Sequence, residues 1–117
     1  MDLDLAVKKH AEWKLKFRSA ISNKETMDVA TISKDNCCEL GKWLHGEAKH
    51  KLGHLASYLD CVGKHAVFHT EAGKVASAIN AKKYAEAESM IDAGTSYHAV
   101  SGAVGTAIMR LKRESSA

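Results

Sequence analysis

The sequence contains no proline at all. Proline interrupts helices because it has no backbone N–H and its ring clashes with the preceding turn, so nothing of this kind limits helix length here. Long apolar runs are also absent, and none is long enough to span a bilayer. The acidic opening segment, residues 1–6, is unlike the basic start of a signal peptide. We therefore expect an all-α protein with no membrane span in this chain.

Cysteine is scarce, with residues at positions 37, 38 and 61 only. An odd number without framework spacing argues against disulfides and favours a reducing compartment, so we expect a cytoplasmic location. The net charge of +3 is mild, and the basic residues gather only at 110–113, where cations suit the end of a helix. These observations predict no nucleic-acid partner.

Apolar side chains recur every three or four residues along three segments, as they do on one face of a helix. One stripe consists of Leu55, Tyr58, Val62, His65, His69, Ala72, Ala76 and Ile79. The second consists of Leu3, Ala6, His10, Trp13, Phe17 and Ala20, and the third of Tyr84, Ala87, Ile91, Gly94, His98, Ser101, Gly105 and Ile108.

A short fourth helix is predicted by Asn36 and Glu39, which resemble a capping box. We therefore predict one domain, residues 1–117, folded as an antiparallel four-helix bundle with helices over 2–22, 37–46, 55–79 and 82–112. Residues 94–96 interrupt the last helix, and the sequence leaves open whether it bends there or divides in two.

Four side chains combine into a candidate metal site. His65 and His69 lie one turn apart on an apolar face, where a shared metal ion would provide both buried rings with a partner. His10 lies on the apolar face of the first helix, and Cys38 lies near a helix start, where backbone amides favour a thiolate. Three imidazoles and one thiolate form a nitrogen–sulfur set that suits zinc.

Three blocks of the sequence resemble the chemoreceptor zinc-binding domain (CZB) family. They are HAEW at 10–13, CELGKW at 38–43 and HAVFH at 65–69. The family pattern is His-x-x-aromatic, then Cys-x-Leu-Gly-x-Trp, then His-x-x-x-His. The intervening gaps of 24 and 21 residues are of family-like length.

This resemblance implies one Zn²⁺ ion bound by His10, Cys38, His65 and His69 in a four-helix module of bacterial signal transduction. Such modules are attached to methyl-accepting chemotaxis proteins or diguanylate cyclases, or stand alone. The resemblance further implies a non-enzymatic regulatory domain, a homodimer, and an attached or docked signalling domain. Its signal would be zinc itself or oxidation of the Cys38 thiolate.

Other candidate ligands are weaker. Cys37 is interpreted as a bystander next to Cys38. His50 and His54 are spaced like a ligand pair, but we expect them in a solvated loop between Gly46 and Gly53. His98 lies on the predicted inner stripe and is a candidate to hydrogen-bond a metal ligand.

Three alternative functions compete with this interpretation. A hemerythrin-like di-iron site needs bridging carboxylates, and the inner stripes carry none. A zinc hydrolase needs an open coordination position and a general base, whereas four protein ligands fill a tetrahedron. A purely structural, zinc-stapled dimerisation domain is compatible with the sequence.

Overall fold

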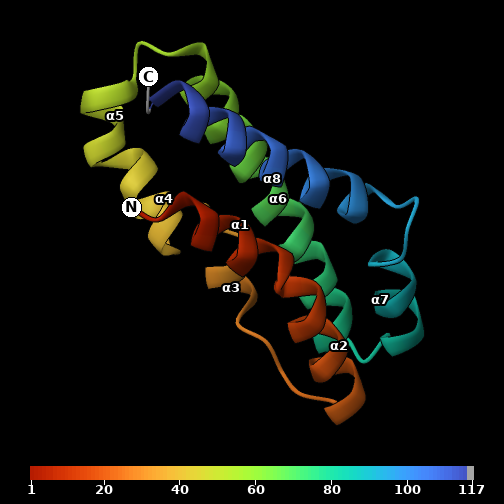
Figure 1. Cartoon of the computed structure of the whole chain (residues 1–117). Helices are drawn as coiled ribbons and strands as arrows, with labels where there is room; N and C mark the ends of the chain where they lie inside the picture. Colours follow the sequence, from red (N-terminus) through yellow and green to blue (C-terminus); the bar gives the residue numbers. More distant parts are fainter. Residues whose placement is uncertain (116–117) are drawn as a thin grey trace.

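The computed structural model describes residues 1–115, which fold into helices without a strand (Figure 1). The last two residues of the predicted domain lie outside this description. The all-α class predicted from the sequence is confirmed. Within residues 1–115 no helix has both the length and the apolar character needed to cross a membrane.

The predicted first helix, 2–22, consists of two helices in sequence. Helix α1 (Leu3–Ala11) begins at Asp2, whose side chain accepts a hydrogen bond from the Leu5 N–H at 3.0 Å. Helix α2 (Trp13–Asn23) follows after Glu12 and ends at Lys24, which has a left-handed backbone conformation.

Helix α6 (Ala56–Asn80) is the longest helix and matches the predicted 55–79 closely. Its most extensive contact is with α8 (Ser96–Ser115), and α1 packs against α8 as well. In Figure 1, α6 and α8 run in opposite directions along the length of the molecule. Several of the largest fully buried side chains of the core lie on these two helices, among them Phe68 and Ile79 of α6 and Ile108 and Leu111 of α8.

The predicted last helix, 82–112, is divided in two. Helix α7 (Tyr84–Met90) ends before a turn in which Gly94 has a φ of +84°, a conformation that other residues rarely adopt. The hydroxyl of Thr95 then accepts a hydrogen bond from the His98 N–H at 3.2 Å, which satisfies a free amide at the start of α8. The sequence leaves open whether the last helix bends or divides here, and the structure shows that it divides.

The stretch between the first and third predicted helices departs most from expectation. It contains an additional turn of helix, α3 (Val29–Ile32), begun by Asp28. The short helix α4 (Glu39–His45) starts two residues later than predicted, because Cys38 rather than Asn36 caps it; the capping box at Asn36 was wrong. The expected loop at 46–53 is largely a helix, α5 (Glu47–Leu52), which restarts after the unusual backbone conformation of Gly46.

Candidate metal centre

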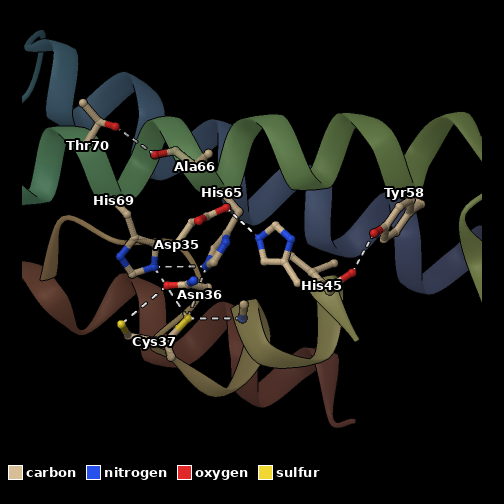
Figure 2. A network of polar contacts seen from close by, with 12 residues as sticks. Asp35, Asn36, Cys37, His45, Tyr58, His65, Ala66, His69 and Thr70 are labelled. Carbon is tan, nitrogen blue, oxygen red and sulfur yellow. Dashed lines mark hydrogen bonds and ion pairs between the residues drawn. The ribbon is translucent and has the colours of Figure 1, made fainter. Parts of the chain in front are cut away.

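The four predicted ligands meet between α1, α4 and α6. His10 comes from the last turn of α1, Cys38 caps α4, and His65 and His69 project from α6. Figure 2 shows the two α6 histidines pointing toward the loop that precedes α4. One donor atom from each of the four residues lies within 4.8 Å of the others, so the side chains are placed to bind a single metal ion.

Five of the six distances between the four donor atoms are close to those of a zinc tetrahedron. The Nε2 atom of His65 lies 3.2 Å from that of His10 and 3.0 Å from that of His69. The Cys38 Sγ atom lies 3.3 Å from His65 Nε2, 3.6 Å from His69 Nε2 and 3.9 Å from His10 Nε2. Zn–N bonds of about 2.0–2.1 Å and a Zn–S bond of about 2.3 Å place ligands about 3.4 Å (N to N) and about 3.6 Å (N to S) apart.

Hydrogen bonds on the outer side fix two of the imidazole rings. His10 Nδ1 donates to the Ala6 carbonyl at 2.7 Å, and His69 Nδ1 donates to the Ile32 carbonyl at 2.8 Å. A carbonyl can only accept, so each Nδ1 carries the hydrogen and each neutral ring presents an Nε2 lone pair to the centre. Lone pairs that converge in this way are placed to bind a metal ion, and this is how metal-binding histidines are oriented in proteins.

Burial keeps the histidines neutral. His10, His65 and His69 are 5%, 0% and 3% exposed. Burial lowers the pKa of His65 to about 3, and the charges of His69 and His10 add to this. Burial also lowers the pKa of His10 and of His69, against the opposing effect of their bonds to backbone carbonyls. Neutral imidazole is the form that binds a metal ion.

Cys38 behaves differently from the expectation for a helix start. Its Sγ atom accepts a hydrogen bond from the Gly41 N–H at 3.3 Å, which favours a thiolate. Burial nevertheless raises the pKa of the thiol and outweighs the backbone amides of Gly41 and Leu40. The thiol of the metal-free protein is therefore protonated at neutral pH, and it is a metal ion that would make it a thiolate.

Gly41 allows the loop before α4 to approach the site. The space beside this glycine is occupied by the backbone of Asp35. A Cβ atom at Gly41 would lie 1.7 Å from the Asp35 carbonyl oxygen, and one at Gly73 would lie 2.6 Å from the Ser33 Cβ. The segment 33–38 is thus held between α4 and α6.

The remaining candidates lie outside the cluster. Cys37 is half-buried and its thiol contacts the Asn36 side chain at 3.6 Å. His50 is exposed on α5, and His54 is exposed just after it. His98 was wrongly placed on the inner face: it is exposed, and Tyr97 points inward instead. The break at Gly94 restarts the helix, so α8 does not continue the phase of the stripe before it.

Sequence reasoning missed two contributors to the site. They are α3, whose Ile32 carbonyl orients His69, and the ion pair of Asp35 with His45, whose Oδ2 and Nε2 atoms are 2.8 Å apart. Asp28 followed by Thr31, which donates to it at 2.7 Å, was the available signal for α3. No carboxylate belongs to the cluster in the described part of the chain, so its donor set does not fit a carboxylate-bridged di-iron site.

Comparison with known proteins agrees with this geometry. The sequence profile of the chemoreceptor zinc-binding domain matches residues 10–76, a stretch that begins at the first predicted ligand and includes the other three. No curated protein and no solved structure gave a significant match to the chain.

Proposed function

Because the chain belongs to the chemoreceptor zinc-binding domain family, we propose that it is one regulatory domain, residues 1–117, whose zinc ion is bound by His10, Cys38, His65 and His69. The observation that carries this proposal is the convergence of four donor atoms within 4.8 Å from three separate segments. A zinc ion with these ligands has a full tetrahedron and no open position for a substrate. We therefore propose a signalling role without catalysis.

Elemental analysis tests the ligand set. Protein purified without added metal should contain one zinc per chain, and Cys38→Ala or His69→Ala should lose most of it. The matched control is the double variant His50→Ala with His54→Ala, which removes two exposed histidines of the same spacing. Iron in place of zinc, full zinc retention in both ligand variants, or loss of zinc in the control would refute the assignment.

The zinc ion would act as a mechanical link. It joins the end of α1 and the start of α4 to α6, so gain, loss or modification of a ligand changes how these helices pack. We propose that this change controls an attached or docked signalling domain of the chemotaxis-receptor or cyclic-di-GMP type. Fusing the chain to such an output domain and comparing output with and without a zinc chelator tests the link.

Oxidation of Cys38 is the second proposed signal. Of the four ligands only Cys38 is reversibly oxidised, and a sulfenic acid is a poor zinc ligand. A cavity of about 340 Å³ reaches His10 and Cys38 from outside, between walls that include Trp13 and Leu40. A cavity of this size admits small oxidants. Cys37 lines a different cavity, together with Asp35 and Thr70.

A zinc indicator combined with mass spectrometry of the Cys37–Cys38 peptide tests the redox signal. Hypochlorous acid should release zinc in step with oxidation of Cys38, and reduction with zinc present should restore binding. Because Cys37 lines a different cavity, its oxidation provides an internal control. If zinc stays bound while only Cys37 is oxidised, the domain is a sensor of zinc level or a structural staple.

We further propose a cytoplasmic location and a homodimer. The location is supported by the odd number of cysteines without framework spacing, which favours a reducing compartment. Leu15 and Leu59 are large apolar side chains that are 63% and 64% exposed, so each is available for contact with a second chain. Light scattering of the zinc-loaded protein should give the mass of two chains, and a monomeric mass at all concentrations would contradict the dimer.

A further inference from the structure

The three histidines of the cluster differ in one respect. His10 and His69 each donate from Nδ1 to a backbone carbonyl, whereas the Nδ1 atom of His65 is buried and has no hydrogen-bond partner among the described residues. A buried ring nitrogen without a partner is costly, and a histidine bound to metal through Nε2 carries a hydrogen on Nδ1 that needs an acceptor. His65 therefore lacks the hydrogen bond from Nδ1 that His10 and His69 both make.

Asp35 is the carboxylate whose charge acts on the ring of His65. Its negative charge opposes the lowering of the pKa at both His65 and His69, and it contributes to the raised pKa of Cys38. Figure 2 shows its side chain directed toward His65 and His45. The bond to His45 engages only Oδ2, so Oδ1 has no hydrogen-bond partner among residues 1–115. The side chain is 28% exposed and thus mostly shielded from water.

The backbone of Asp35 cannot easily move away from the site. Its carbonyl occupies the space that a Cβ atom at Gly41 would fill, and Ser33, two residues earlier, packs closely on Gly73 of α6. His45, at the end of α4, holds the carboxylate from the other side at 2.8 Å. A small rotation of a carboxylate held in this way, rather than movement of the chain, can present Oδ1 to the ring of His65.

We propose that Asp35 is a positioning residue for the metal centre: in the zinc-loaded protein its carboxylate accepts the hydrogen bond from Nδ1 of His65, while His45 holds the carboxylate in place. This inference rests on the ligand set proposed above. The bond sets the tautomer and orientation of His65 and raises the basicity of its Nε2 atom toward the metal. Asp35 also offsets part of the positive charge that zinc brings into a buried site.

Zinc affinity, measured by competition with a chromogenic chelator, tests the proposal. Asp35→Ala should weaken binding by about 10- to 100-fold, the usual effect of removing such an outer partner. Asp35→Asn keeps the shape and one acceptor oxygen but not the charge, so its loss should be smaller. The matched control is Asp60→Asn, which removes a carboxylate of α6 that pairs with Lys64 at 3.3 Å; its affinity should stay within about twofold of the wild type.

The Nδ1-bound hydrogen of His65 gives a second readout, which a merely structural role of Asp35 would not move. In the zinc-loaded wild type its proton resonance should be shifted downfield and slow to exchange, as expected for a bond to a carboxylate. It should move upfield in Asp35→Asn, and the resonances of His10 and His69 should stay in place. An unchanged His65 resonance, or equal affinity of Asp35→Ala and the control, overturns the proposal. Failure of the wild type to bind zinc would refute the ligand set instead.

Discussion

His69 and Ile32 are joined by a hydrogen bond of 2.8 Å between the ring Nδ1 and the backbone carbonyl, although they are 37 positions apart in the sequence. This bond makes α3, a single turn of helix, part of the metal centre. It connects the orientation of one proposed ligand to a segment that has no ligand of its own. The loop between α2 and α4 therefore belongs to the functional unit.

Removing zinc should loosen the segments around the metal that carry a single ligand or only orient one. Hydrogen exchange, with and without a strong chelator, should increase mainly in α1, α3 and α4. Helix α6 carries two of the proposed ligands and packs along α8, so both should stay protected by their own core. Equal increases in all helices would mean that the metal stabilises the whole fold. No change in exchange would mean that the metal does not hold α1, α3 and α4 against α6.

Gly41→Ala should disrupt the loop beside the site. The added Cβ atom would lie 1.7 Å from the Asp35 carbonyl oxygen, a contact that only a shift of the backbone can relieve. We expect a loss of at least about 1–3 kcal/mol in the free energy of unfolding, together with weaker zinc binding. Urea titration and chelator competition measure the two effects.

Gly63→Ala is the matched control for this substitution. Gly63 is exposed on α6, and an added Cβ atom there would meet nothing within 4 Å. Alanine is favoured over glycine inside a helix, so this variant should gain roughly 0.5–1 kcal/mol and bind zinc normally. Similar losses in both variants would show that the close approach of Asp35 does not limit the site.

The metal-free protein should lose stability as the pH falls below neutral. The pKa values of His10, His65 and His69 are lowered in the folded state, that of His65 to about 3. Below the unfolded value of about 6.5 the unfolded chain therefore binds more protons than the folded chain. The contribution of these histidines to the free energy of unfolding is fully present above pH 6.5 and is lost as the pH falls toward 3. The loss is about 1.4 kcal/mol per pH unit for each proton that the unfolded chain binds and the folded chain does not.

Urea unfolding in the presence of a chelator, at intervals from pH 8 to pH 4, measures this slope. His65→Asn should reduce it, because one buried ring that resists protonation has been removed. A free energy of unfolding that is constant from pH 7 to pH 5 would contradict the burial of the three rings in the metal-free state.

Zinc binding at pH 7 should release about one proton per ion. The buried thiol of Cys38 has a raised pKa and is protonated before binding, whereas the three histidines are already neutral. Calorimetry in buffers of different ionisation enthalpy counts the protons. Release of two or more would mean that a ring is protonated in the metal-free protein, and release of none would argue against Cys38 as a thiolate ligand.

The helix periodicity and the positions of the four proposed ligands could be predicted from the sequence. Apolar spacing along one helix is a local property, so the faces that carry His10, His65 and His69 were visible without a structure. The conformation of Gly94 shows why α8 was harder to assign: the chain turns there and the helix restarts, which moved His98 outward and Tyr97 inward.

Only the tertiary structure decided the surroundings of these ligands. The bond from His69 to Ile32, the approach of Asp35 to Gly41, and the gap beside His65 join segments that are distant in the sequence. Such contacts have no period and no local signature, because they depend on how separate helices pack. The same packing supplies the burial that raises the pKa of Cys38 against the effect of its own helix start. The sequence by itself determined which atoms can bind the metal, and the packing of the helices decided their protonation, their orientation and the partners that hold them.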